Sequence, residues 1–448
     1  MLLNLLFFAS VMKGVGGVVL AIVILLAMVT IHEFGHYIAG KLLGFKINEF
    51  AVGFGPAIFK KRSKKTGVLF ALRAIPLGGY CAFDGEDEDL TDKKDEEKNE
   101  EEPFAEMNAE KTQNSENAGG MSETNENSSV TKKEENEETS KKKEDEYPEP
   151  QGARFNDQAP WKRIIVLVAG ATMNYLLALV IIILMFACVG RPTYQVEKLT
   201  YVLEGDKRVE YNTEHALDTY NSGLKTGDTV LKIDGKTLYL STDWLDALEG
   251  KKKGETVKVL VIRDGKKQTI DVVLAEDAKV KNMSDNSAIF FALGIAAREE
   301  INGEMKLTRG GGLSTYEYRE GFFQTIGNSF MYSFKLGGTV LRSLGELLTG
   351  KLGIKAMGGP VTTISVTAEA ATSGFASFLN IAALIGVNLA VFNLLPVPAL
   401  DGCKVIFCII EWIRKKPINR KVETIISLVG LAFLLGFAIL VDVLHFIL

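Results

Sequence analysis

The sequence predicts a polytopic α-helical membrane protein with a small membrane-associated β element and a separate β-rich domain. Three observations lead to this fold class: four long apolar stretches, lysine and arginine clusters at the ends of those stretches, and short alternating runs with glycine turns. Hydrophobic residues make up 47% of the chain and charged residues 24%. Because the two kinds occupy different stretches, the average composition conceals membrane segments beside polar ones.

Each apolar stretch satisfies the length that a bilayer requires, about 20 mostly apolar residues in a helix. The predicted spans run from Gly16 into the region of His32, then Ile164–Val189, Phe378–Leu395 and Ile425–Leu448. The first resembles a signal peptide because Lys13 precedes an apolar run. No small-x-small cleavage site follows that run, so we expect a retained helix.

Basic residues predict the orientation of the spans, because lysine and arginine accumulate on the cytoplasmic side. They follow the first span, precede the second and lie between the third and fourth: Lys41, Lys46, Lys60, Lys61, Arg62, Lys64, Lys65, Arg73, Lys162, Arg163, Lys404, Arg414, Lys415, Lys416, Arg420 and Lys421. These sides are therefore expected to be cytoplasmic. Residues 190–375 and both termini are then expected on the outer side.

The polar segments have three different characters. Residues 44–85 contain the alternating runs Asn48–Phe54 and Val68–Ala74, which predict short strands. In the β-rich stretch 195–277, strands are predicted at Thr229–Ile233 and Val257–Ile262, each followed by an Asp-Gly turn. Residues 317–350 alternate apolar with charged residues, which favours an interfacial amphipathic helix over a fifth span.

Residues 86–158 form an acidic insert that is predicted to be disordered and cytoplasmic. The stretch from Glu86 to Glu149 holds 24 acidic and 9 basic residues, a local net charge of −15. The whole chain carries −5, so the remainder carries +10. The insert has too few large apolar side chains to form a core. The four cysteines show no disulfide-framework spacing and are expected to be free thiols.

The strongest chemical signal is the run His32-Glu33-Phe34-Gly35-His36 in the first span. Two histidines four residues apart share one face of a helix, so both imidazoles can reach a single metal ion. Glu33 then lies beside the metal and can take a proton from water. The alternative is a pair of ordinary surface histidines. The apolar surroundings argue against it, because ionisable residues near lipid are costly unless they serve a function.

A catalytic zinc usually has three protein ligands and one open position. Asp401 is the candidate for the third ligand, because Pro396 and Pro398 break the third span just before it and Gly402 follows it. Irregular backbone at membrane depth is tolerated where protein or a water-filled cavity surrounds it. His215 and His445 are poorer candidates, since both are expected on the outer side. The alternative for Asp401 is a carboxylate at the cytoplasmic interface.

Together these motifs resemble the site-2 proteases, and more narrowly their bacterial branch with a PDZ domain, the regulator-of-sigma-E protease group. The resemblance covers nearly the whole chain except the acidic insert. It is carried by HEFGH, by Asn393-Leu-Leu-Pro-Val-Pro-Ala-Leu-Asp401-Gly402, by Gly53-Phe-Gly55-Pro and Ile75-Pro-Leu-Gly-Gly-Tyr80, by Gly170 with Asn174, and by the PDZ-like core Ser222–Gly235.

The resemblance implies an intramembrane zinc endopeptidase with one Zn²⁺ per chain in a bacterial cytoplasmic membrane. Its implied ligands are His32, His36 and Asp401, with Glu33 as the base and Asn393 as a polar group for substrate or oxyanion. Substrate contacts are implied for Gly53, Phe54, Gly55, Pro396, Pro398 and Asn174. The expected partners are single-span membrane proteins such as anti-sigma factors or signal-peptide remnants, an upstream trimming protease and membrane lipid. No nucleic-acid partner is expected.

Some features depart from the family pattern. Ala171 replaces a proline, and Cys403 replaces a second glycine after the LDG motif, either for packing or as a thiol near zinc. The segment Glu204–Thr219 is longer and more polar than usual, which affects the expected peptide groove. Three other functions stay open: a catalytically inactive adaptor that binds transmembrane peptides, a zinc-handling membrane protein, and a peptide receptor.

The chain is therefore predicted to divide into nine parts, four of which are transmembrane. An extracytoplasmic PDZ-like α+β domain lies between the second and third transmembrane parts. The boundaries are 1–43 (first transmembrane region with HExxH), 44–85 (β element), 86–158 (acidic insert), 159–190 (second transmembrane helix), 195–277 (PDZ-like domain), 278–375 (extracytoplasmic segment with the amphipathic helix), 376–402 (third transmembrane helix with LDG), 403–423 (basic cytoplasmic loop) and 424–448 (fourth transmembrane helix).

Overall fold

The computed structural model describes most of the chain outside the acidic insert. The described residues are 2–86, 147–197, 201–204, 207–210, 223–278, 287–301, 304–310, 313–353 and 357–447. They form two compact units. The first unit comprises residues 1–28, 171–393 and 434–448, and the second comprises 29–170 and 394–433. The predicted disorder of residues 87–146 lies outside the described part.

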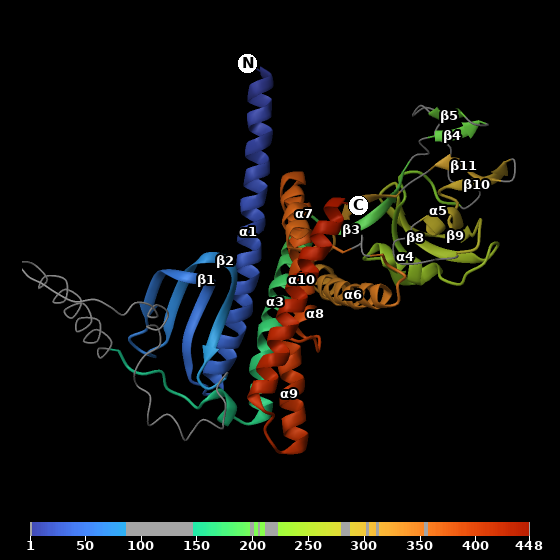
Figure 1. The fold of residues 1–448 in the computed structure, drawn as a ribbon. Helices are drawn as coiled ribbons and strands as arrows, with labels where there is room; N and C mark the ends of the chain where they lie inside the picture. Colours follow the sequence, from blue (N-terminus) through green and yellow to red (C-terminus); the bar gives the residue numbers. More distant parts are fainter. Residues whose placement is uncertain are drawn as a thin grey trace, which may run out of the picture. The chain divides into compact units, whose positions relative to one another are not determined.

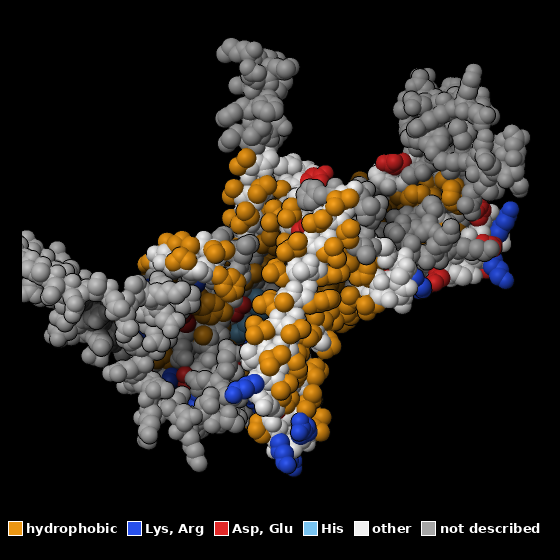
Figure 2. Space-filling model, in the orientation of Figure 1, with side chains coloured by type: hydrophobic (Ala, Val, Ile, Leu, Met, Phe, Trp, Pro, Cys, Tyr) orange, Lys and Arg blue, Asp and Glu red, His pale blue; other side chains and the backbone are white. Residues whose placement is uncertain are grey.

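Among the residues that the structure describes, four helices are long and apolar enough to cross a membrane, as predicted. They are α1 (Leu2–Leu42), α3 (Pro160–Cys188), α8 (Phe375–Asn393) and α10 (Arg420–Ile447), all visible in Figure 1. The HExxH motif lies within α1, which continues to Leu42 and so agrees with the predicted first transmembrane region. Figure 2 shows hydrophobic side chains along α10 and basic ones near its start.

The LDG motif lies outside the third span, in contrast to the boundary predicted at residue 402. Helix α8 ends at Asn393, and a separate helix, α9, runs Asp401–Arg414. The basic segment 403–423 is therefore largely helical rather than a loop. Pro396 and Pro398 prevent α8 from continuing, because proline lacks a backbone N–H donor and its ring clashes with the preceding helical turn. A side chain at Gly402 would lie 2.5 Å from the Leu394 carbonyl carbon, so glycine permits this tight connection.

The β element folds from β1 (Ile47–Arg62) and β2 (Leu69–Phe83). Both strands are longer than predicted and double back, so that Phe50 pairs with Cys81 and also with Phe70. Residues 49–52 therefore have partners on both sides, 79–82 and 69–72. Residues 59–62 pair only with 69–72. The edges of this sheet are consequently residues 79–83 and 57–62, whereas residues 49–52 are internal.

The end of the acidic insert is ordered, which corrects its predicted boundary at residue 158. Phe155 begins a short 3-10 helix, η1 (Phe155–Asp157), and is buried at 4% exposure. Phe155 packs with Phe45 and Phe83 in a core shared by α1, the β element and α3. Residues 147–158 are therefore an ordered segment of the second unit and not part of a solvated linker.

The β-rich domain of the first unit is larger than the predicted 195–277. Its main sheet has the order β12-β3-β6-β8-β9, and β7 (Lys236–Thr237) pairs with β6. The bounds are β3 (Arg191–Val196), β6 (Thr229–Ile233), β8 (Thr256–Arg263), β9 (Lys266–Val273) and β12 (Leu313–Tyr318). Because β12 pairs with β3, the domain extends from Arg191 to Tyr318, and we call it the β domain.

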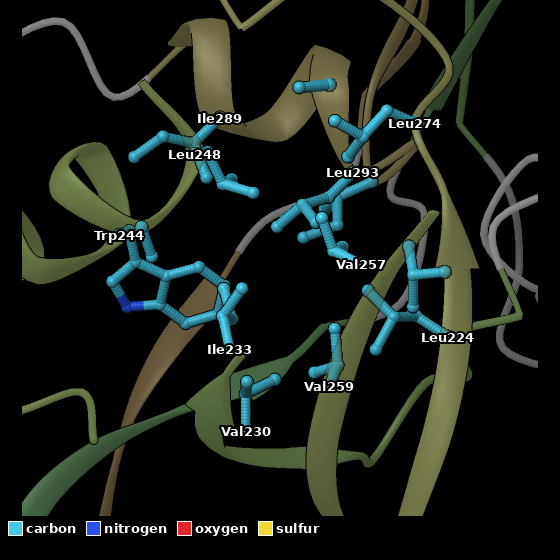
Figure 3. Close-up of a cluster of buried hydrophobic side chains, with 14 of the residues drawn as sticks. Leu224, Val230, Ile233, Trp244, Leu248, Val257, Val259, Leu274, Ile289 and Leu293 are labelled. Carbon is cyan, nitrogen blue, oxygen red and sulfur yellow. The ribbon is translucent and has the colours of Figure 1, made fainter. Parts of the chain in front are cut away.

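The predicted strands and Asp-Gly turns of the β domain are confirmed. Asp234 and Asp264 have positive φ angles of 45° and 50°, as do the glycines after them, which suits tight hairpin turns. Trp244 of helix α4 (Ser241–Leu248) packs with valines and leucines in the core shown in Figure 3. A second sheet contains β10 (Ala297–Ile301), β11 (Glu304–Gly310), β4 (Tyr201–Glu204) and β5 (Lys207–Glu210), and a short helix, α5 (Ser287–Ala292), precedes β10 in the chain.

The predicted amphipathic helix is present as α6 (Phe322–Leu348). One face contacts the β domain, where Lys335 pairs with Asp243 and Arg342 Nη1 lies 2.6 Å from Asp246. The other face leaves Phe323 and Phe334 exposed. A further helix, α7 (Pro360–Ser373), begins against α10 of the same unit, and Asp442 accepts hydrogen bonds from the backbone N–H groups of its first turn.

Candidate metal centre

Three predicted ligands converge within the second unit. His32 and His36 lie one turn apart on α1 and are both buried, and Asp401 is the first residue of α9. The Nε2 atoms of the two histidines are 3.1 Å apart. Asp401 Oδ2 lies 3.0 Å from His32 Nε2 and 3.4 Å from His36 Nε2. Three donor atoms therefore face one point.

The spacing of these atoms fits zinc. Zn–N bonds of about 2.0–2.1 Å at tetrahedral angles place two ligand atoms about 3.3 Å apart. The observed separations of 3.0, 3.1 and 3.4 Å surround that value. Two imidazoles and one carboxylate also form a donor set typical of catalytic zinc, which leaves a fourth position free. Among the described residues, these three form the group of histidine, cysteine or carboxylate side chains that lie close enough to one another to share a metal ion.

The orientation of His36 is fixed from α3. His36 Nδ1 donates a hydrogen bond to the backbone oxygen of Val166, at 2.9 Å. Because Nδ1 carries that proton, Nε2 presents its lone pair toward His32 and Asp401. A backbone carbonyl of the second span therefore selects the tautomer that binds a metal ion.

Glycines allow α1 and α3 to approach closely at the centre. A Cβ atom at Gly35 would lie 2.8 Å from the carbonyl carbon of Ala169. A Cβ atom at Gly170 would lie 2.7 Å from His36 Cε1 and 2.8 Å from His32 Cε1. Real Cβ atoms do not approach other atoms so closely, so both positions require glycine. The two imidazoles rest directly on the backbone of Gly170.

Asp401 is held as a carboxylate. Its burial raises the pKa of the carboxyl, but hydrogen bonds and positive charge from the two adjacent imidazoles, when these are protonated, outweigh that effect and keep the pKa well below its usual range. Its position in the first turn of α9 also favours a negative charge. The preceding backbone is strained, because Ala399 has a left-handed φ of 74°. This bend turns the chain into α9.

Glu33 lies next to an edge of the β element. Its carboxylate accepts a hydrogen bond from the backbone of Cys81. A Cβ atom at Gly79 would lie 3.2 Å from Glu33 Cγ, so the glycine keeps the strand close to the helix. The edge 79–83 therefore passes directly beside the expected base.

The remaining predicted site residues are placed as follows. Gly53, Phe54 and Gly55 form a bend in β1, where the glycines have φ angles of 86° and 80° and Phe54 is half exposed. Pro396 and Pro398 lie between α8 and α9, and a Cβ atom at Gly430 of α10 would lie 2.8 Å from the Pro398 carbonyl. Asn174 and Asn393 belong to the first unit. Cys403 is buried outside the ligand group, and His215 is not among the described residues.

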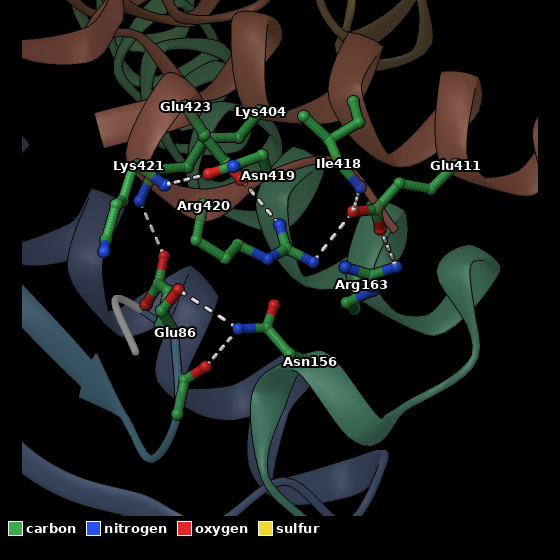
Figure 4. Close-up of polar contacts among 11 residues, drawn as sticks. Glu86, Asn156, Arg163, Lys404, Glu411, Ile418, Asn419, Arg420, Lys421 and Glu423 are labelled. Carbon is green, nitrogen blue, oxygen red and sulfur yellow. Dashed lines mark hydrogen bonds and ion pairs between the residues drawn. The ribbon is translucent and has the colours of Figure 1, made fainter. Parts of the chain in front are cut away.

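A buried ionic network beside the centre was not predicted. Glu411 of α9 pairs with Arg163 of α3 and, at 2.8 Å, with Arg420 of α10, as Figure 4 shows. All three side chains are 7% exposed or less. From the sequence, the two arginines serve only as markers of topology. The available signal was Glu411 itself, a lone carboxylate in the apolar run Val405–Ile413.

Comparison with known proteins decides the family, because the model of peptidase family M50 matches residues 20–437. The chain belongs to peptidase family M50. It is also similar to the regulator of sigma-W protease RasP of Bacillus subtilis, with 27% identity over 94% of this chain and 96% of the relative. The zinc metalloprotease RasP of Bacillus licheniformis is 28% identical over 93% and 96% of the two chains. The chain is thus a zinc-dependent intramembrane protease of the site-2 type, as its motifs predicted.

Proposed function

We propose that His32, His36 and Asp401 hold the zinc and that Glu33 is the general base. The observation that supports this assignment is the convergence of the three ligand atoms at separations of 3.0–3.4 Å. A zinc ion held there supplies Lewis acidity that polarises the scissile carbonyl and makes water acidic near neutral pH. Glu33 accepts the proton from the attacking water and delivers it to the leaving amine. Asn393 is assigned to oxyanion stabilisation on its motif alone.

The substrate binds in an extended form, because a peptide bond inside a helix is shielded by its own hydrogen bonds. The alternating sequence predicts pairing with an edge strand within about Glu49–Phe59. The first part of that stretch is internal in the sheet, since Glu49–Val52 has partners on both sides, whereas its end, from Ala57, belongs to the other edge. The edge 79–83 is the better candidate, because Cys81 on it contacts Glu33. Strand addition at this edge uses backbone hydrogen bonds and tolerates varied side chains.

The bend at Gly53, Phe54 and Gly55 and the loop with Pro396 and Pro398 are further substrate contacts in this proposal. Both belong to the unit that carries the ligands. Asn174 is assigned to substrate binding on its motif alone.

The substrates are single-span membrane proteins that an upstream protease has already trimmed. Bacillus subtilis RasP is named as a regulator of sigma-W protease, which favours transmembrane anti-sigma factors, and signal-peptide remnants are the other class. By the distribution of basic residues, both termini and the β domain are extracytoplasmic. The β domain, as a PDZ-like domain, acts as a size filter that excludes untrimmed substrates.

Co-expression with a tagged single-span reporter, truncated on its outer side, tests this function. The Glu33→Gln variant keeps the ligands but lacks the base, so cleavage is expected with the unmutated protein alone. Equal cleavage of the reporter by both proteins would assign the activity to another protease. If neither protein cleaved a panel of truncated reporters although zinc was bound, the chain would be an adaptor that binds transmembrane peptides.

A further inference from the structure

Arg73 of β2 joins the two segments of the β element that the proposed function assigns to substrate binding. Its Nη2 donates hydrogen bonds to the Tyr80 hydroxyl, at 2.5 Å, and to Glu49 Oε1, at 2.7 Å. Its Nη1 donates to the Gly55 carbonyl, at 2.9 Å. Tyr80 lies on the edge 79–83, and Gly55 lies in the bend of β1. One guanidinium group therefore contacts the edge, the neighbouring internal strand and the bend.

These polar side chains lie on the face of the sheet that points away from the core. Successive residues of a strand point to opposite faces. Cys81 belongs to the core shared with α1 and α3, so its neighbour Tyr80 points to the other face. Ala51 pairs with Tyr80 and is fully buried, and Glu49 lies two residues before it on the same face. Because the alanine side chain is small, the Arg73 side chain can lie across this face.

The three side chains form a closed set of hydrogen bonds. Arg73 and Glu49 are 21% and 18% exposed, so their ion pair is partly shielded from water. The Tyr80 hydroxyl accepts from Arg73 and also hydrogen-bonds the Glu49 carboxylate. A hydrogen bond between two charged groups is roughly twice as strong as one between neutral groups. The planar guanidinium also holds its donors in fixed directions, which a lysine at this position would not do.

The bend and the edge also meet through aromatic rings. Phe54 stacks on Tyr80, with ring centroids 6.4 Å apart and an interplanar angle of 23°. A Cβ atom at Gly78 would lie 3.0 Å from Phe54 Cζ, so the Phe54 ring lies directly over the backbone that leads into the edge. Gly55 has a φ of 80°, and glycine restrains the backbone less than any other residue. The hydrogen bond from Arg73 to its carbonyl supplies the missing restraint.

The edge 79–83 determines where a substrate strand lies relative to the base. Cys81 contacts Glu33 through its backbone, and Tyr80 is the residue before it. A strand added to an edge is aligned by backbone hydrogen bonds with that edge. The position of residues 79–83 therefore sets the position of the scissile bond beside Glu33. An edge has a paired strand on one side only, so side-chain contacts such as that of Tyr80 contribute to holding it in place.

We propose that Arg73 is a positioning residue of the protease, which holds the edge through Tyr80 and the bend through Gly55 in the arrangement that an extended substrate requires. The inference rests on the proposed function, in which this edge and this bend contact the substrate. Arg73 acts through these neighbours, so its loss weakens substrate binding. At saturation the added strand itself restores the position of the edge, so the chemical step changes little.

Steady-state cleavage of the truncated single-span reporter by the full-length protein tests the proposal. Arg73→Gln is expected to raise KM by about ten-fold, the effect of losing one hydrogen bond to a charged group, and to leave kcat and zinc content nearly unchanged. A substitution that only lowered the folded fraction would reduce kcat at constant KM. That result, a normal KM, or a loss of zinc would overturn the proposal. Arg62→Gln is the matched control, because Arg62 lies on the opposite edge 57–62 of the same sheet. An equal rise in its KM would also contradict the role of Arg73.

Glu33→Gln in the same assay separates this inference from the proposed function. If Glu33→Gln cleaves the reporter as well as the unmutated protein does, the proposed function and the role of Arg73 fail together. If Glu33→Gln is inactive and Arg73→Gln has a normal KM, the role of Arg73 alone fails. Should Arg73→Gln not fold, Tyr80→Phe replaces it, because it removes the hydroxyl that Arg73 contacts and retains the ion pair with Glu49. A raised KM in Tyr80→Phe supports the proposal, and a normal KM overturns it.

Discussion

His36 donates its Nδ1–H to the backbone oxygen of Val166, at 2.9 Å, and this bond joins the metal centre to the second span. Three residues earlier on the same helix, Arg163 pairs with Glu411 of the helix that Asp401 begins. Helix α3 thus contacts both sides of the ligand set, His36 through a carbonyl and α9 through a guanidinium. The position of this helix determines how closely the histidines and Asp401 can approach.

Gly170→Ala is expected to reduce zinc affinity at least ten-fold. The added methyl group would lie within 2.8 Å of both imidazoles. It would therefore displace the imidazole nitrogens from their positions beside Asp401. Competition with a zinc chelator measures the affinity. Gly436→Ala is the matched control, because a Cβ atom at Gly436 meets nothing within 4 Å on α10. Equal zinc affinity in both variants would show that the imidazoles do not rest on Gly170.

Glu411→Gln is expected to destabilise the protein by about 3 to 5 kcal/mol, because removal of one partner leaves buried charges uncompensated. Arg163 and Arg420 would lose their shared carboxylate. Reversible unfolding in sodium dodecyl sulfate measures the free energy. Arg342→Gln is the comparison, since the pair of Arg342 with Asp246 is solvent-exposed and should contribute at most about 1 kcal/mol. Similar losses in both variants would contradict a buried network.

Asn393→Ala is expected to lower kcat for reporter cleavage by about 10² to 10³, the usual effect of removing one oxyanion donor. Zinc content should not change, because Asn393 is not in the ligand group. Cleavage rates and zinc content are measured on the same preparation. A normal kcat, or a loss of zinc with the activity, would remove Asn393 from the proposed role.

Excision of the β domain is expected to allow cleavage of full-length, untrimmed substrates. The register shows where to cut, because Arg191 and Tyr318 are partners at the base of the domain. A short Gly-Ser linker in place of residues 192–317 would join the flanking helices, whereas removal of 200–277 alone would leave β12 paired with β3. Untrimmed reporters are compared in the intact and excised proteins. If excision leaves untrimmed reporters uncut, the domain is not a size filter.

The metal centre was predictable because its chemistry is local. His32, Glu33 and His36 lie within five residues, and helical spacing alone brings the imidazoles together. Asp401 required a break in an apolar span, which the prolines indicate. The arrangement of strands in the β element and the extent of the β domain could not be predicted, because both depend on pairing between residues distant in the sequence. The internal position of Glu49–Val52 follows from irregular register, and β12 joins β3 across more than a hundred residues.

Zinc content of the purified protein and two variants tests the central claim most directly. One zinc per chain is expected in the unmutated protein and in Glu33→Gln, and none in Asp401→Ala after dialysis. Asp271→Ala, at an exposed carboxylate of the β domain, controls for the loss of a charge. Proteolysis should be absent in Glu33→Gln and Asp401→Ala alike. A full complement of zinc with retained proteolysis in Asp401→Ala would contradict the ligand set proposed for this protein.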